Sequence, residues 1–157
     1  IQGIWGQGGC LVGWSMQIEA GMTPAQLVPC GTEGTNGMRV LMLPKGAVKG
    51  PEPTYTALGA KGISLENPPG SGALALKLAL EVLNGKKVPK ATIMPPQTVT
   101  SADIKLCKEG TWTEMKSGCN VFDPSLVPPG WFANIYSPDT PEIGFQAALV
   151  GEPETKK

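Results

Sequence analysis

The 157-residue chain contains no histidine and a single arginine, Arg39, and its acidic and basic residues are equal in number. Without histidine it lacks the side chain that most readily exchanges protons near neutral pH, and its cysteines lack the usual base of a cysteine nucleophile. No serine stands in a Gly-x-Ser-x-Gly setting either. These absences argue against an enzyme. A zero net charge with one arginine also gives no basic footprint for nucleic acid, so no nucleic-acid partner is expected.

Long hydrophobic runs are missing as well. No window holds the roughly twenty apolar residues of a membrane span, and no basic-then-apolar leader opens the chain, so a direct membrane span is not expected. The hydrophobic fraction of 41% argues against wholesale disorder. The 21 glycines and 16 prolines are scattered without a period, which indicates a loop-rich globular chain.

The four cysteines form no Cys-x-x-Cys pair. A zinc site would need all four thiolates in unusual spacings, so no metal is expected. Cys107 and Cys119 bracket a polar, glycine-containing loop that a disulfide could close. Cys10 and Cys30 lie near the ends of two expected strands, where they either pair or serve as small buried apolar residues. Both interpretations favour an oxidising compartment over the cytosol.

The first 36 residues predict a strand, a helix and a second strand. The strand at 1–5 leads into a Gln7-Gly8-Gly9 loop, and Leu11, Trp14 and Ile18 then recur at helical spacing over 9–20. A second strand near Cys30 leads into a loop at 32–34. Parallel pairing of the two strands would bring both loops to the edge where open α/β sheets bind small ligands. The pattern predicts an α/β fold with a parallel sheet flanked by helices.

Further along the chain the elements are shorter. A helix is expected at 34–43 with a cap at Thr35 or Asn36, a strand at 62–65, the clearest helix at 71–83 and a strand at 91–94. Short helices at 101–108 and a helix or strand at 145–150 are weaker predictions. The aromatic residues Trp131, Phe132 and Tyr136 are expected to anchor a loop-rich tail on the globule, with stacking on a sugar as the alternative.

The order of these features resembles the later half of the type I periplasmic binding proteins, the sugar receptors of ABC importers. The features are the loop after the first strand, the break at Ala20-Gly21, Glu33 followed by glycine and Asn36, and the segments 62–68 and 83–89. The resemblance covers roughly the first hundred residues. It implies a two-lobed fold of about twice this length, so that the chain is expected to be a fragment or one piece of an assembly.

The resemblance also implies a division of the chain. Residues 1–66 would be part of the carboxyl-terminal lobe, and residues 67–100 would supply the crossover, helix and strand of the amino-terminal lobe. Residues 101–157 would form a loop-rich tail that packs on the globule. The partners would be the rest of its own two-lobed protein, a small sugar-like ligand and an ABC permease.

Family contacts carried over by position place six residues at the ligand. They are Gln7, Gly8, Glu33, Asn36, Glu66 and Asn67. Gly8 stands where the family has a carboxylate that grips a hydroxyl, which implies a larger or less polar ligand than a pentose. Glu33 and Glu66 have no obvious basic partner, and both are expected at a cleft mouth outside the core. A glutamate at 66, where an amide is commoner, favours a polyol or a positively charged ligand.

The expected function is capture of a sugar or polyol by hinge closure and delivery to an ABC permease, in the periplasm or another extracytoplasmic space, without a cofactor. One alternative is the sensor domain of a sugar-responsive transcription regulator. A more remote one is an NAD-binding domain, because the loop at 6–9 follows a strand and opens a helix. The third glycine of that fingerprint would fall at Leu11, so the spacing does not fit.

Overall fold

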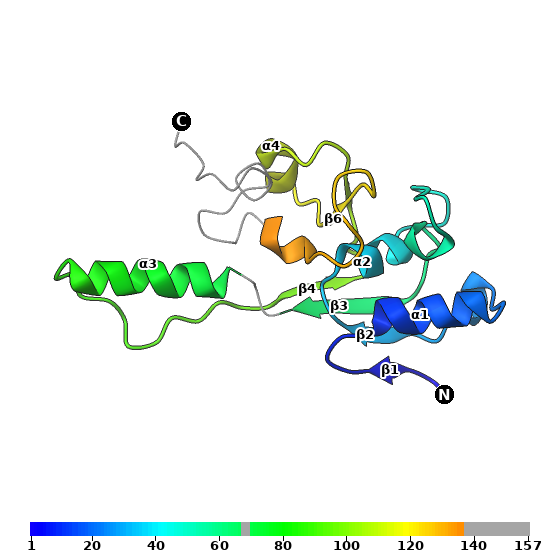
Figure 1. The fold of residues 1–157 in the computed structure, drawn as a ribbon, viewed down its shortest axis with the longest axis horizontal. Helices are drawn as coiled ribbons and strands as arrows, with labels where there is room; N and C mark the ends of the chain where they lie inside the picture. Colours follow the sequence, from blue (N-terminus) through cyan, green and yellow to red (C-terminus); the bar gives the residue numbers. More distant parts are fainter. Residues whose placement is uncertain (67–69, 137–157) are drawn as a thin grey trace.

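A computed structural model describes residues 1–66 and 70–136 (Figure 1). In chain order the elements are β1 (Ile4–Trp5), α1 (Cys10–Glu19), β2 (Cys30–Thr32), α2 (Asn36–Met42), β3 (Gly62–Glu66), α3 (Ser71–Leu83), β4 (Gln97–Thr100), β5 (Leu106–Cys107), α4 (Trp112–Lys116) and β6 (Val121–Phe122), with short 3-10 helices at Pro24–Gln26, Pro53–Tyr55 and Ala133–Tyr136. Within the described ranges no helix is both long and apolar enough to cross a membrane. The element expected at 145–150 lies outside the described residues.

The main sheet has the strand order β1-β2-β3-β4. Strands β1 and β2 pair in parallel with Ile4 opposite Cys30, and β2 pairs in parallel with β3. Strand β4 is antiparallel to β3. The prediction of an α/β fold with a mostly parallel sheet is confirmed, and the loops after β1 and β2 leave the same edge of the sheet.

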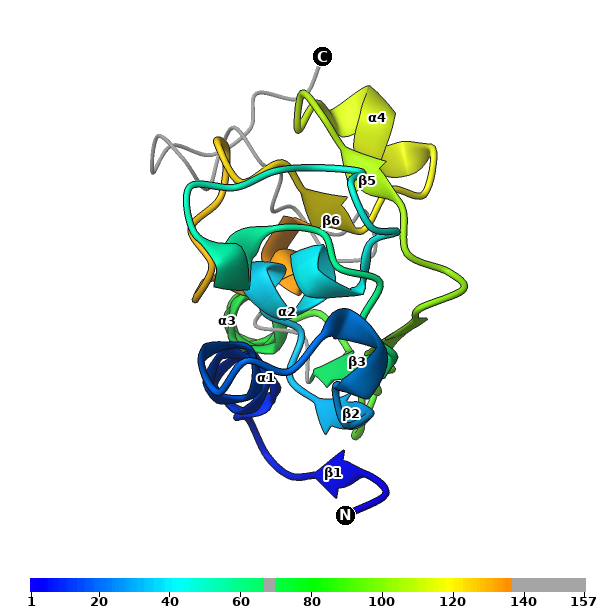
Figure 2. The same ribbon diagram turned by 90° about the vertical axis from the view of Figure 1, so that its right-hand side faces the viewer.

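Helices α1 and α2 pack together against one face of this sheet (Figure 2). Trp14 of α1 is fully buried with Met38 and Leu41 of α2, and its indole Nε1 donates a hydrogen bond of 2.8 Å to the Val28 carbonyl. The apolar residues at helical spacing therefore lie on one side of α1, and that side packs in the core as expected. Thr35, one of the two expected caps of α2, accepts a hydrogen bond from the Met38 N–H.

Both candidate disulfides form. Cys10–Cys30 joins the first residue of α1 to the first residue of β2, and Cys107–Cys119 closes the loop that contains α4. Of the two interpretations left open for Cys10 and Cys30, the disulfide is therefore confirmed. Two disulfides fit an oxidising compartment.

The other face of the sheet carries Trp5 near its edge. Side chains alternate along a strand, so Cys30 and Ser64 face the helices while Gly31 and Ile63 face the opposite way. The ring of Trp5 lies against Gly31, where an added Cβ would come within 2.6 Å of ring atoms. The position of this ring therefore requires glycine at 31.

Helix α3 forms over the expected residues, yet none of its residues is buried. Figure 1 shows α3 extending away from the rest of the described chain, and the following segment runs back beside it. The strand predicted at 91–94 is wrong, because the returning chain lies alongside β3 only at 97–100 and forms β4 there. The helix predicted at 101–108 is also wrong, since this segment instead contributes β5, which pairs with β6.

Residues 101–136 contact α2, where Val121 of β6 shares a core cluster with Val40. A second core cluster joins Cys107, Phe122, Val127 and Tyr136. The rings of Phe122 and Tyr136 meet edge to face with centroids 5.1 Å apart. Tyr136 therefore packs within the tail, and its predicted role in anchoring the tail on the globule stays a prediction.

Arg39 of α2, the single arginine, is fully buried and joins the segments of the fold. Its guanidinium donates hydrogen bonds to Ser64 Oγ at 2.8 Å, Gln97 Oε1 at 3.0 Å, the Asn120 carbonyl at 2.7 Å and Asn134 Oδ1. Burial lowers the pKa of Arg39 from its ordinary value to about 9, and attraction to Glu66 opposes this shift. The group is therefore charged at pH 7, and its acceptors lie on β3, β4 and the tail.

Replacement of Arg39 should therefore destabilise the whole fold. Arg39→Met leaves these four acceptors without their donor and Glu66 without the nearby positive charge, and the free energy of unfolding should fall by about 3 to 5 kcal/mol. Arg39→Lys keeps the charge without the planar set of donors, so it should fall by a smaller amount. Urea unfolding monitored by tryptophan fluorescence measures both. The exposed control Lys45→Met should change stability by less than about 0.5 kcal/mol, and equal midpoints for Arg39→Met and this control would contradict the role of Arg39.

Candidate functional site

A cavity of about 630 Å³ lies at the carboxyl edge of β2 and β3. It is lined by Trp5, Gly6, Gln7, Gly8, Thr32, Glu33, Leu65, Glu66, Pro96 and Phe132. Four of the six residues expected at the ligand, Gln7, Gly8, Glu33 and Glu66, are among them. Asn67 lies outside the described residues. The cavity therefore unites the ends of three strands with a residue from the tail.

The loop after β1 enters the cavity because glycine permits its turn. Gly8 and Gly9 have φ angles of 85° and 109°, in the left-handed region that favours glycine. The Gly8 N–H donates to Thr32 Oγ1, which fixes this loop against the end of β2. Gln7 directly precedes Gly8, and its exposed side chain lies on the cavity wall.

Glu33 occupies the amino-terminal end of α1. Its carboxylate accepts backbone hydrogen bonds from Leu11 at 3.1 Å and Cys10 at 3.4 Å. These are N–H groups of the first turn, which have no partner within the helix, and the helix dipole favours a negative charge there. Glu33 is only 8% exposed, so the expectation that it stands outside the core is wrong. The burial is tolerated because both carboxylate oxygens are hydrogen-bonded.

Glu66 is the last residue of β3 and is half-buried on the cavity wall. One oxygen, Oε2, accepts a hydrogen bond of 3.0 Å from the Gly34 N–H. Its charge attracts the guanidinium of Arg39 and raises the pKa of that group against the effect of burial. The expectation that Glu66 lacks a basic partner is therefore wrong, although Arg39 itself does not line the cavity.

Asn36, expected at the ligand, lies inside the fold instead. It is fully buried, and its Nδ2 donates to Tyr55 Oη at 2.9 Å and to the Phe122 carbonyl at 3.0 Å. Its Oδ1 accepts from the Phe122 N–H at 2.8 Å. The assignment of Asn36 to the ligand site is corrected accordingly: its amide holds β6 of the tail against α2.

The tail reaches the cavity through Phe132. The first N–H groups of α2, at Asn36 and Gly37, donate to carbonyls of Trp131 and Pro129 at 2.7 and 2.8 Å. The Ala133 N–H donates to the Gly34 carbonyl at 2.8 Å. These bonds hold Phe132 at the mouth, where its ring is 37% exposed.

Thr32 belongs to the loop at 32–34 that was expected at this edge, whereas sequence reasoning missed Trp5, Leu65 and Pro96 as lining residues. Trp5 ends β1 and Leu65 is the next-to-last residue of β3, so their place at the carboxyl edge of a parallel sheet was a usable signal. Pro96 reaches the cavity because β4 begins directly after it beside β3. That antiparallel pairing gives no local signal in the sequence.

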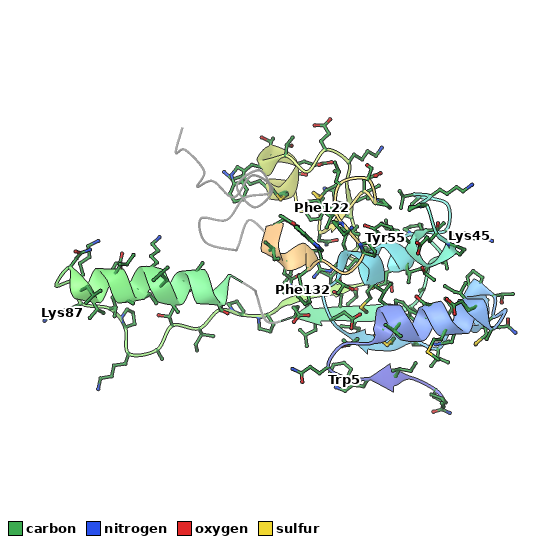
Figure 3. The ribbon with its side chains drawn as sticks, in the orientation of Figure 1. Trp5, Lys45, Tyr55, Lys87, Phe122 and Phe132 are labelled. Atoms are coloured by element: carbon green, nitrogen blue, oxygen red, sulfur yellow. A yellow bond between two sulfur atoms is a disulfide. The ribbon has the colours of Figure 1, made fainter. Side chains whose placement is uncertain are left out.

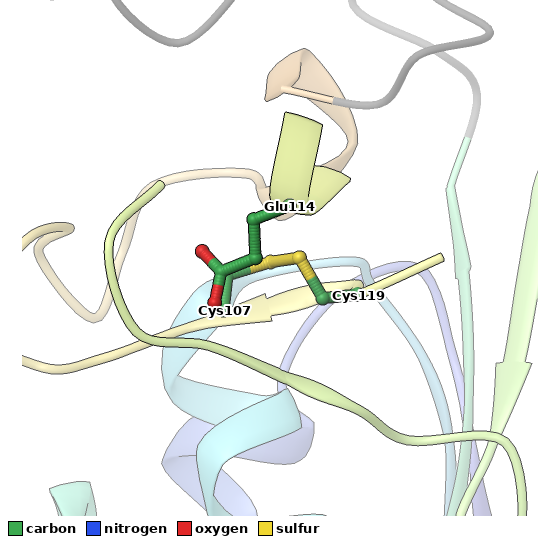
Figure 4. Close-up of side chains that lie close together, drawn as sticks. All are labelled: Cys107, Glu114 and Cys119. Carbon is green, nitrogen blue, oxygen red and sulfur yellow. A yellow bond between two sulfur atoms is a disulfide. The ribbon is translucent and has the colours of Figure 1, made fainter. Parts of the chain in front are cut away.

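Cys107, Glu114 and Cys119 place three potential ligand atoms within 4.8 Å of one another (Figure 4). The two sulfur atoms are bonded to each other and offer no thiolate. Partial burial raises the pKa of Glu114, but backbone N–H donors at Lys108, Glu109 and Gly110 and the charge of Lys108 outweigh it, so the pKa is lowered overall. The Glu114 carboxylate stabilises this turn through these hydrogen bonds, and the three residues do not fit a metal site.

Comparison of the chain with family models, curated proteins and solved structures gave no match. The geometry of the cavity therefore carries the functional argument alone.

The contacts of Glu33 predict a loss of stability on mutation. Glu33→Ala removes both acceptors at the start of α1, so the free energy of unfolding should fall by about 1 to 2 kcal/mol in urea unfolding. Glu33→Gln retains one amide oxygen and should lose less. Glu19→Ala, an exposed glutamate at the other end of α1, is the matched control. Equal stability of Glu33→Ala and Glu19→Ala would show that the contacts at the start of α1 contribute nothing.

Proposed function

We propose that this chain is part of an extracytoplasmic solute-binding protein that captures a sugar or polyol and delivers it to an ABC permease. The observation that carries the proposal is the cavity at the carboxyl edge of the parallel strands. Open α/β sheets bind ligands at this edge, and the cavity combines polar groups with aromatic walls, as a sugar site requires. Gln7, Gly8, Glu33 and Glu66 meet there although they come from three separate segments.

The path of the chain around α3 supports a second lobe. Strand β3 leads out toward α3, and the chain returns to pair β4 beside β3 (Figure 1). On α3 the side chains of Leu76, Leu80 and Leu83 are 63%, 51% and 81% exposed. A helix with so much exposed leucine is normally covered in a folded protein. A second lobe packed on α3 would cover it, and movement of that lobe relative to the sheet would close the cavity on a ligand.

The uncovered face of the sheet supports the same proposal. A second cavity of about 640 Å³ lies on this face, between residues of β1, β2, β3 and β4. Trp5 and Ile63, which line it, are 73% and 42% exposed. Parallel sheets are normally covered on both faces, so further elements of a larger lobe would pack here.

Two alternatives are weaker. A sugar-responsive regulator works in the cytosol, where disulfides such as Cys10–Cys30 rarely persist. A dinucleotide would place its pyrophosphate at the start of α1, where Glu33 already accepts the backbone N–H groups and would repel it. The solute-binding proposal avoids both conflicts.

Calorimetry of the full-length protein against ribose, galactose, glucose and inositol tests the proposal. At least one should bind with saturable heat, and Glu66→Ala should weaken that binding about ten-fold because it removes a charged acceptor for a hydroxyl. Glu19→Ala should bind as the wild type does. Heat with none of these solutes, together with tight binding of NAD, would reject the proposal.

A further inference from the structure

The charges around the cavity are of one sign. Among the described residues, its lining includes the carboxylates of Glu33 and Glu66 and no lysine or arginine. Arg39 is close enough to attract Glu66, but it is fully buried and its guanidinium already donates to four acceptors on β3, β4 and the tail. It therefore has no surface through which to contact a ligand.

The two carboxylates are not equivalent. Glu33 is 8% exposed, and each of its oxygens accepts a backbone hydrogen bond at the positive end of α1. Glu66 is half-buried, and its one hydrogen bond in the described structure goes from the Gly34 N–H to Oε2. Its Oε1 and the remaining lone pairs are available to a donor in the cavity. Glu66 is therefore the carboxylate that can contact a ligand directly.

Aromatic rings from opposite ends of the chain complete the walls. Trp5 comes from β1 and Phe132 from the tail, and both line the cavity (Figure 3). Trp5 is 73% exposed and Phe132 is 37% exposed. The π electrons give an aromatic face negative charge, so it attracts cations. The same face is apolar enough to pack against the apolar face of a sugar ring. Rings beside a carboxylate are the surroundings in which proteins bind organic cations.

We propose that the cavity binds a sugar or cyclitol that carries a protonated amine. The amine would lie toward Glu66, and the apolar face of the ring would lie toward Phe132 and Trp5. This inference rests on the proposed function and narrows it, since a neutral sugar gains only hydrogen bonds from Glu66 whereas an ammonium group also gains charge attraction. Phe132 would be a specificity residue supplied by the tail.

Paired calorimetric titrations of the full-length protein test this inference. Glucosamine and galactosamine are compared with glucose and galactose at about pH 6, well below the pKa of an α-amino group. At least one amino sugar should bind about ten-fold tighter than its neutral parent. The N-acetyl derivatives, which have the nitrogen without the charge, should lose this advantage.

Variants identify the residues responsible. Glu66→Gln keeps the shape and an oxygen for the Gly34 N–H but removes the charge near Arg39, so it should remain folded with a lowered melting temperature. Amino and neutral sugars should bind this variant with equal affinity. Phe132→Leu should weaken both forms of sugar by a similar factor, and Glu19→Gln should change neither. Thermal unfolding of each variant verifies that it is folded.

The outcomes separate the two proposals. If neutral sugars bind the wild-type protein as tightly as their amino counterparts, the inference is wrong and the proposed solute-binding function stands. An amino-sugar preference that survives in folded Glu66→Gln would overturn the role of Glu66. Absence of binding by every sugar, neutral or aminated, would overturn the proposed function together with the inference.

Discussion

The buried charge of Arg39 is the constraint on which the rest of the described structure depends. A guanidinium withdrawn from water is tolerated only when its donors are paired and an opposite charge is near. Here the acceptors lie on β3, β4, the segment before β6 and the tail, and Glu66 supplies the charge. None of these segments can shift alone without leaving the cation poorly paired. One side chain thus fixes how sheet, helix and tail are assembled.

The same assembly shapes the cavity. Bonds from α2 to the tail use the first N–H groups of that helix, which would otherwise be open to an anionic ligand. Glu33 closes the start of α1 in the same manner. The first N–H groups of both helices near the cavity are therefore already hydrogen-bonded, so a ligand there would be contacted by side chains. The exposed lining combines the aromatic Trp5 and Phe132 with the amide of Gln7 and the partly exposed carboxylate of Glu66, which fits neutral or cationic ligands better than phosphates or carboxylates.

Local patterns in the sequence were sufficient for much of the fold. The apolar spacing around Trp14 predicted α1, and the serine, leucines and glycine of 71–85 predicted α3. Two strands followed by polar loops predicted the parallel pairing and hence the edge at which Gln7, Gly8, Glu33 and Glu66 meet. The same topology allowed the Cys10–Cys30 disulfide and one polar loop allowed Cys107–Cys119, but the sequence left the pairing open.

The remaining features depend on contacts between distant residues. Asn36 bonds to Phe122, 86 residues away, and nothing near Asn36 distinguishes such a buried amide from a ligand contact. Strand β4 forms where the chain meets β3, which local propensity at 91–94 does not reveal. The burial of Glu33 depends on the unpaired N–H groups of a helix that begins 23 residues earlier. Phe132 reaches the cavity only because the tail folds back on α2.

Under the proposed function, the contact between Trp5 and Gly31 affects how preference for a ligand could evolve. Every substitution of glycine adds at least a Cβ, and at position 31 that atom would collide with the indole ring. The ring would have to move, and one wall of the cavity would move with it. Gly31 itself is not among the residues that line this cavity. A substitution at Gly31 would therefore change selectivity for the proposed solute, although this residue does not line the cavity.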